Sequence, residues 1–258
     1  LEAPKELLKA LNVHVVGGWP EKPEDAIIEL CDNKDELQAV IAAVPFLRDR
    51  DLRKMVQDEN YDDRLDAIRE GILKTYTEIA DHCVQNYRDI PAIAMGHLYM
   101  RNTRLSESER DIQVGNQAGV EAKRFPDQFS YYALGHLHTP QEDDTGRLVY
   151  SGSPYPLSFS EKDNQPRVMM LTVNGTDIET RSVDIPRYRK LVKYAGTLEE
   201  VRKSLDSFSG DPSQLETLIE LEVIEQHQNP ETILGLETLQ EEFDTENARI
   251  IKSRIRFL

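Results

Sequence analysis

Apolar residues recur along the chain in two rhythms, and the slower one predicts helices. Between Asp62 and Tyr87 they return every three to four residues, which is the spacing of one helix face. This is the longest helix that the sequence predicts. Lys5–Leu11 shows the same spacing over fewer residues, and Pro4 just before it is typical of a helix start.

The faster rhythm consists of short apolar runs that predict strands. Val13–Val16 is one such run, and Ala26–Cys31 and Leu37–Phe46 flank a turn-rich interval that suits two adjacent strands. Asn174-Gly175 is a typical hairpin turn between two later strands. One long helix with many short strands predicts mixed α/β layers. The other strands predicted in this part are Pro91–Met95, Tyr131–Leu134, Leu148–Tyr150, Val168–Val173, Ile178–Val183 and Tyr188–Tyr194.

The pattern changes after Pro186, where helix and strand spacing alternate regularly. The predicted elements of this tail are a helix at Leu198–Phe208, a strand at Leu215–Ile224, a helix at Glu231–Phe243 and a strand at Ala248–Phe257. With Tyr188–Tyr194 in front they make a β-α-β-α-β unit. We therefore expect two domains, residues 1–186 and a smaller α+β domain of residues 187–258.

The composition is that of a globular protein, with 39% hydrophobic and 30% charged residues. The formal charge of −16 argues against nucleic-acid binding by bulk electrostatics, which rests on Lys and Arg. A nuclease can still be acidic, because metal ions supply positive charge at the phosphate. No apolar run approaches the roughly 20 residues of a membrane span, and the first residues do not resemble a secretion signal, so we expect a cytoplasmic location.

Three of the six histidines stand at the ends of predicted strands, close behind a glycine: His97, His136 and His138. Ligands gather at the carboxyl ends of strands in layered α/β proteins, and a glycine there lets the backbone approach an ion. Neutral imidazole is a good ligand for Mn, Fe and Zn. The pattern therefore predicts a metal site. The other histidines have ordinary surroundings and are expected to lie elsewhere: His14, His82 and His227.

A site with two cations also needs a bridging carboxylate, because the two ions repel each other. Asp127 stands too far ahead of the Gly-His-Leu-His strand end, and Asp143-Asp144 fall in a loop that we expect to be solvated. The sequence thus predicts half of a site and no catalytic residue that can be named. Cys31 and Cys83 each stand alone and are expected to be reduced thiols.

Three segments together resemble the SbcD-like nucleases, which are calcineurin-like metallophosphoesterases. They are Ala-Met-Gly-His-Leu at 94–98, Tyr-Ala-Leu-Gly-His-Leu-His at 132–138, and Tyr-Ser-Gly-Ser-Pro-Tyr-Pro-Leu-Ser-Phe at 150–159. Gly-His-x-His occurs throughout the superfamily, whereas the Gly-Ser-Pro-x-Pro-Leu-Ser-Phe run is more specific. Pro45–Arg48 also matches, and the tail is similar to the capping domain of these nucleases.

The resemblance implies a layered metallophosphoesterase sandwich with a capping domain, and two-metal hydrolysis of DNA phosphodiester bonds. It implies His97 and His136 as ligands of one metal ion and His138 as a ligand of the other. It further implies two Mn²⁺ ions in the complete site, double-stranded DNA as substrate, a homodimer, and an SbcC-like ATPase partner. The residues that contact DNA stay unassigned, although Arg187, Arg189, Lys190 and Lys193 form a basic group that could meet phosphates.

Part of the family pattern is missing ahead of Gly96-His97. SbcD-like proteins begin with Asp-x-His, Gly-Asp and Gly-Asn-His-Asp motifs, which carry the remaining ligands and the catalytic histidine. Leu1–Leu8 looks like the helix that follows the last of these, so we expect a fragment. Two alternatives stay open: a metallophosphoesterase that acts on a phosphoprotein or nucleotide, and a scaffold without catalytic activity.

Overall fold

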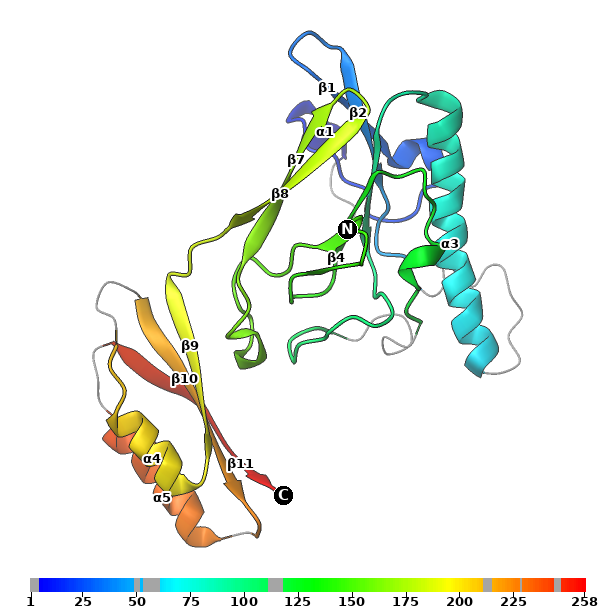
Figure 1. Ribbon diagram of the computed structural model, residues 1–258. Coiled ribbons are helices and arrows are strands. Elements are labelled where there is room, and N and C mark those ends of the chain that lie inside the picture. Colours follow the sequence, from blue (N-terminus) through cyan, green and yellow to red (C-terminus); the bar gives the residue numbers. More distant parts are fainter. Residues whose placement is uncertain are drawn as a thin grey trace. The chain divides into compact units, whose positions relative to one another are not determined.

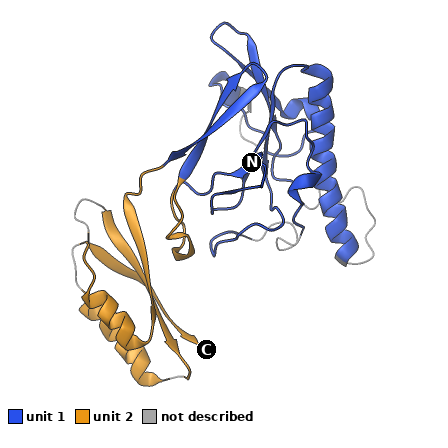
Figure 2. Cartoon of the chain, viewed as in Figure 1, with its two compact units in different colours: residues 1–154, 167–184 blue, residues 155–166, 185–258 orange. Residues whose placement is uncertain are grey.

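The structure is a computed structural model that describes residues 5–48, 52, 61–110, 118–210, 215–227, 229–243 and 247–258. The chain forms two compact units (Figure 2). Unit one contains Leu1–Pro154 and Arg167–Asp184, and unit two contains Tyr155–Pro166 and Ile185–Leu258. The segment Tyr155–Pro166 thus belongs with the tail, a grouping that a division at Pro186 does not include.

Unit one is built on a six-stranded sheet of order β1-β2-β3-β4-β6-β5 (Figure 1). Strands β2, β3, β4 and β6 run parallel, and the two edge strands are antiparallel to their neighbours. The carboxyl ends of β3 and β4 are therefore adjacent, with His97 paired with Gly135. The strands are β1 (Ile27–Cys31), β2 (Leu37–Ala43), β3 (Ala92–His97), β4 (Tyr131–Gly135), β5 (Gln141–Glu142) and β6 (Leu148–Tyr150).

The long helix α3 (Tyr61–Asn86) covers one face of this sheet, as the sequence predicts (Figure 1). It packs against Ala94 of β3 and Tyr132 of β4 in the main hydrophobic core. Its buried residues recur at the expected spacing and include Leu65, Ile68, Ile72, Tyr76 and Ile79. Shorter helical elements of unit one are α1 (Lys5–Ala10), η1 (Pro23–Ala26) and η3 (Ala122–Arg124).

A hairpin of β7 (Arg167–Asn174) and β8 (Asp177–Asp184) supplies a second, smaller core. Met169, Leu171 and Ile178 pack against Ile93, Tyr131 and Val149 of the sheet. The central strands thus bury apolar side chains on both faces, as parallel strands usually do. The hairpin turn is Gly175-Thr176, one residue later than predicted, and Gly175 has the positive φ of 62° that suits glycine.

Unit two confirms the predicted β-α-β-α-β order. Its parallel sheet has the order β11-β10-β9, and α4 and α5 cover one face (Figure 1). Thr197 and Glu200 form a reciprocal cap at the start of α4, which fixes where that helix begins. The elements are η4 (Phe159–Glu161), β9 (Arg189–Gly196), α4 (Leu198–Asp206), β10 (Leu215–Glu225), α5 (Pro230–Glu242) and β11 (Ala248–Phe257).

One predicted strand is wrong, although the mixed α/β class is confirmed. Val13–Val16 is irregular, and Val13 is exposed. A β-branched run becomes a strand only where a neighbouring strand takes up its backbone hydrogen bonds, and no strand among the described residues pairs with this run. Among the helices of the described residues, none has the length and apolar character needed to cross a membrane.

Candidate metal-binding site

The ends of β3 and β4 bring two of the predicted histidines together. His97 is the last residue of β3, and His136 directly follows β4. Their ring centroids lie 5.3 Å apart in an edge-to-face arrangement. Phe46 approaches the other side of His97, with 5.9 Å between ring centroids. The strand-end pattern in the sequence thus corresponds to a real cluster of imidazoles.

The two glycines before these histidines make room for side chains of the protein. A Cβ on Gly96 would overlap the hydroxyl of Tyr76, which is fully buried and donates a hydrogen bond to the Met95 carbonyl at 3.2 Å. A Cβ on Gly135 would lie 3.2 Å from Nδ1 of His97. The sequence suggests that these glycines open space for an ion, but packing against Tyr76 and His97 already requires them.

His138 lies two residues further on and is held by hydrogen bonds with several described residues. Its backbone N–H donates to Oε1 of Glu109 at 2.7 Å, and its Nδ1 lies 2.7 Å from Oγ of Ser108. Its carbonyl accepts from the Ser153 N–H at 2.9 Å. Gly152 has a φ of 83°, and a Cβ there would lie 2.7 Å from the same carbonyl. The Gly-Ser-Pro segment that carries the family resemblance therefore packs against His138.

The histidines influence each other electrostatically. The pKa of His97 is lowered, first because neighbouring groups remove water from the ring and second because a charge on His138 opposes a charge on His97. A lowered pKa favours neutral imidazole, which is the form that binds metal ions. His138 therefore lies close enough to His97 for the two imidazoles to interact electrostatically.

His136 is buried and has a φ of 109°, a left-handed conformation that is costly for any residue with a Cβ. Such strain is concentrated at functional sites in proteins. The other histidines lie in different surroundings, as expected. His14 is exposed in the irregular segment of unit one, His82 lies on α3 beside Tyr87, and His227 is exposed in unit two.

Two of the carboxylates considered from the sequence have structural partners. Asp127 pairs with Arg147 at 3.0 Å. Asp143 accepts hydrogen bonds from the backbone of Arg147 and Leu148, and from the hydroxyl of Thr145. Burial alone would raise the pKa of Asp143, but these hydrogen bonds outweigh it and lower the pKa. Neither carboxylate behaves as a ligand that awaits an ion.

The donor set is suitable in chemistry but incomplete. In the part of the chain that the structure describes, no group of three or more His, Cys, Asp or Glu is arranged to hold a metal ion. His97 and His136 provide two imidazoles at one place, and His138 stands close enough to affect His97. These residues fit a metal as ligands of a site that needs further donors.

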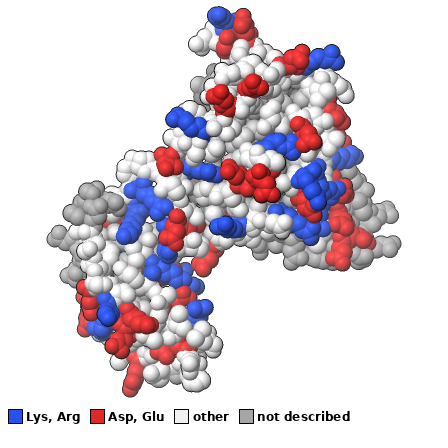
Figure 3. Space-filling view, in the orientation of Figure 1, with Lys and Arg blue, Asp and Glu red and all other residues white. Residues whose placement is uncertain are grey.

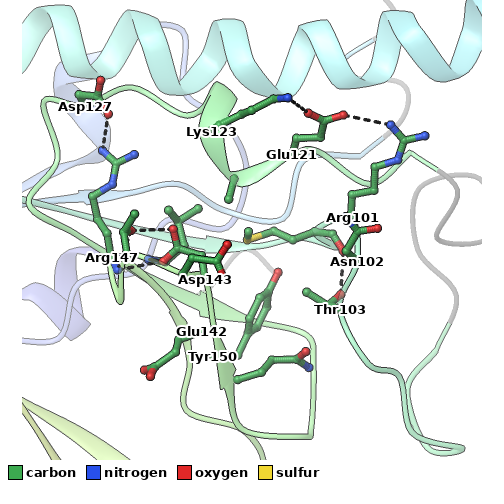
Figure 4. A pocket seen from close by; sticks show the side chains of 16 residues that line it. Arg101, Asn102, Thr103, Glu121, Lys123, Asp127, Glu142, Asp143, Arg147 and Tyr150 are labelled. Atoms are coloured by element: carbon green, nitrogen blue, oxygen red, sulfur yellow. Dashed lines mark hydrogen bonds and ion pairs between the residues drawn. The ribbon is translucent and has the colours of Figure 1, made fainter.

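A separate pocket of about 630 Å³ lies in unit one beside η3, β5 and β6 (Figure 4). None of the three histidines lines it. Its cations are committed to neighbours: Arg101 and Lys123 pair with Glu121, and Arg147 pairs with Asp127. Because its cations already pair with carboxylates, this pocket is not suited to bind an anion.

The basic group at the start of β9 is largely engaged within unit two. The Arg187 guanidinium donates to the carbonyls of Lys162, Asp163 and Asn164. Lys193 lies 2.6 Å from the buried Glu222. The expectation that this group meets phosphates is therefore weakened. Lys and Arg alternate with Asp and Glu over the visible surface (Figure 3).

The exposed cations of unit two gather instead on β11. This strand carries four basic residues and no acidic residue. They pair with the glutamates of β10 on the sheet face that the helices leave open. The four residues are Arg249, Lys252, Arg254 and Arg256.

The fold and the strand-end histidines define an α/β protein that presents imidazole side chains at the carboxyl edge of a parallel sheet. No family model matches the chain. It is 34% identical over 195 residues to the SbcD subunit of the nuclease SbcCD of Rhodobacter capsulatus, a match that covers 72% of this chain and 47% of the relative. The chain is an SbcD-like protein, as its motifs indicate.

Two further relatives with the same name agree. The protein of Bacillus subtilis is 31% identical over 212 residues, covering 80% of this chain and 52% of the relative. The protein of Escherichia coli K12 is 26% identical over 227 residues, covering 86% of this chain and 56% of the relative. The chain spans about half the length of the curated relatives that it matches.

Proposed function

We propose that this chain is part of the nuclease subunit of an SbcCD-like complex, a metal-dependent enzyme that hydrolyses phosphodiester bonds of DNA. One observation carries the proposal. His97 and His136 end neighbouring parallel strands with their rings 5.3 Å apart, in a chain similar over most of its length to proteins named as the SbcD subunit of the nuclease SbcCD. The name of these relatives supports both the activity and the complex.

In the complete site His97 and His136 would bind one metal ion, and His138 would bind the other. Mn²⁺ is the ion we propose, because imidazole and oxygen donors suit it. When bound, two such ions would neutralise the scissile phosphate and lower the pKa of a water molecule. The bridging carboxylate and the catalytic histidine would come from the complete protein.

The two units would have different tasks. The sheet of unit one and its β7–β8 hairpin would form part of the metallophosphoesterase sandwich. Unit two would be the capping domain, which shapes access for double-stranded DNA and performs no chemistry. An SbcC-like ATPase, a homodimer and the cytoplasmic location expected from the sequence complete the proposal.

The test compares the complete protein with Mn²⁺ on a linear DNA duplex and on a small aryl phosphodiester. We expect duplex cleavage, and His136→Ala should reduce it at least about 100-fold, as loss of a metal-site residue commonly does. His82→Ala is the matched control, since His82 lies on α3 away from the strand ends. Equal cleavage by wild type and His136→Ala would refute the assignment.

The same assay separates the alternatives. A different metallophosphoesterase would hydrolyse the aryl substrate and leave the duplex intact, and a scaffold would hydrolyse neither. The isolated chain should bind Mn²⁺ weakly and cleave DNA poorly, because its described residues provide only part of a donor set. Strong Mn²⁺-dependent cleavage by the isolated chain, lost on His136→Ala, would contradict that expectation.

A further inference from the structure

A short polar segment, residues 106–109, lies against His138. Glu109 uses one carboxylate oxygen to accept the His138 backbone N–H and the other to accept the Ser106 backbone N–H. Ser108 places its hydroxyl oxygen 2.7 Å from Nδ1 of the His138 ring. With the Ser153 N–H donating to the His138 carbonyl, the backbone is fixed on both sides, and Ser108 holds the ring at Nδ1.

The hydroxyls continue this network one step further. Ser106 Oγ lies 3.0 Å from Ser108 Oγ, so the Ser108 hydroxyl has two polar neighbours. A hydroxyl can accept one hydrogen bond and donate another. If Ser108 accepts from Nδ1–H of His138, its own O–H is available to Ser106. Ser106, Ser108 and Glu109 are all half-buried, which reduces competition from water for these hydrogen bonds.

We propose that Ser108 is a positioning residue that holds His138 as the Nδ1–H tautomer, so that Nε2 is the nitrogen presented to a metal ion. The inference rests on the proposed metal site, in which one ring nitrogen binds the ion and the other donates to a neighbour. Glu109 acts on the backbone, because it accepts the His138 backbone N–H and so fixes the position of the main chain that carries the ring. Ser108 acts on the ring, since it contacts Nδ1.

The experiment reads the ring nitrogens directly, in the metal-free chain. The chain is labelled with ¹⁵N-histidine, treated with a chelator and studied by NMR at a pH well above the usual histidine pKa of about 6.5. His138→Gln identifies the signals of His138. Wild type should show a protonated Nδ1 and an unprotonated Nε2. A protonated Nε2 in wild type would overturn the proposal without any variant.

Variants then assign the effect to the hydroxyl. Ser108→Ala should convert the His138 signals to a tautomer mixture, and Ser108→Thr, which keeps the hydroxyl, should preserve the wild-type pattern. Ser207→Ala is the control, because the Ser207 hydroxyl binds the Ser204 carbonyl in unit two. An unchanged His138 pattern in a folded Ser108→Ala chain would also overturn the proposal.

Metal affinity gives a second readout. Mn²⁺ binding to the chain, followed by electron paramagnetic resonance, should weaken about 10- to 100-fold in Ser108→Ala, the usual effect of removing a partner of a metal-binding histidine. If wild type shows the expected tautomer but no Mn²⁺ binding at any concentration, the metal assignment fails while the role of Ser108 in setting the tautomer is supported.

Discussion

The two units bury ionisable groups in opposite ways. In unit two, the carboxylates of Glu220 and Glu222 are 0% and 7% exposed, and each lies near several cations of the adjacent strands. In unit one, imidazoles are gathered near imidazoles, and the charge of His138 lowers the pKa of His97. The first arrangement cancels charge within the fold, whereas the second disfavours any added proton.

This difference indicates what each unit can do. Buried carboxylates surrounded by Lys and Arg are complete without a ligand, because each charge already has its counterion. Neighbouring neutral imidazoles carry no charge that needs a counterion, and their nitrogen lone pairs are suited in chemistry to bind a cation. The comparison therefore favours a structural role for the ion pairs of unit two and a ligand-binding role for the histidines of unit one.

The largest expected effect comes from removing a cation from unit two. Lys193→Ala removes the 2.6 Å partner of Glu222 and a cation beside the buried Glu220. Arg254 and Arg256 still pair with Glu222, so we expect a loss of about 3 kcal/mol in the free energy of unfolding, the lower end for broken buried pairs. Urea unfolding of the chain would measure it. Lys190→Ala, an exposed lysine of the same strand, should change stability by less than about 0.5 kcal/mol.

A double variant sharpens this prediction. Glu222→Gln added to Lys193→Ala removes the buried charge that has lost its nearest partner, so the double variant should be more stable than Lys193→Ala alone. If both single lysine variants behave alike, the ion pairs do not stabilise unit two, and the contrast between the units disappears.

The next effect concerns packing under the histidines of unit one. Gly96→Ala would push a methyl group onto the Tyr76 hydroxyl, and overpacking of this kind costs about 2 kcal/mol. Thermal unfolding would detect it. Gly18→Ala is the matched control, because a Cβ there meets only the Arg48 side chain at 3.6 Å. Tyr76→Phe should relieve part of the cost in the Gly96→Ala background, and no relief would assign the requirement for glycine to another contact.

Regular patterns explain why much of this fold can be predicted from the sequence. The tail has amphipathic helices with clear ends, such as the Thr197–Glu200 cap, and the histidines stand out because each lies behind a glycine at a strand end. These features can be predicted because they depend only on the spacing of residues close together in the sequence. Val13–Val16 is misleading because strand formation depends on a partner strand that the run itself does not specify.

The polar contacts of His138 could not be predicted in the same way. Ser108 and Glu109 lie in a segment without apolar periodicity, about 30 positions before His138, and only the folded chain brings them together. Likewise, the reason for Gly96 is the hydroxyl of Tyr76, which belongs to a different element. Sequence patterns locate the candidate histidines but not the residues that hold them.

A smaller effect should appear on acidification of unit two. The Lys193 hydrogen bond, aided by the charges of Lys193, Arg254 and Arg256, holds the pKa of Glu222 below its usual value, although burial opposes this. A lowered folded pKa stabilises the fold above the unfolded pKa of about 4.3, and this contribution is lost as the pH falls through the folded value. Glu222→Gln should flatten the stability curve of the chain in this range. A curve with the same slope in both proteins would exclude Glu222 as the cause.

The smallest expected effect is on DNA affinity in the complete protein. Arg249 and Arg256 of β11 have side chains 63% and 55% exposed, so both can reach a phosphate. Replacing both by alanine should weaken duplex binding a few-fold and lower the slope of log affinity against log salt by about 0.9 for each phosphate that is no longer neutralised. Arg189→Ala with Lys190→Ala is the matched comparison at the site suggested by the sequence, and it should change the slope less, because the Arg189 side chain is only 37% exposed. Fluorescence anisotropy at several salt concentrations measures both slopes.

A larger change from the β9 pair would mean that the start of β9, and not β11, binds phosphates. Unchanged slopes in both double variants would mean that unit two does not bind the DNA backbone through either strand.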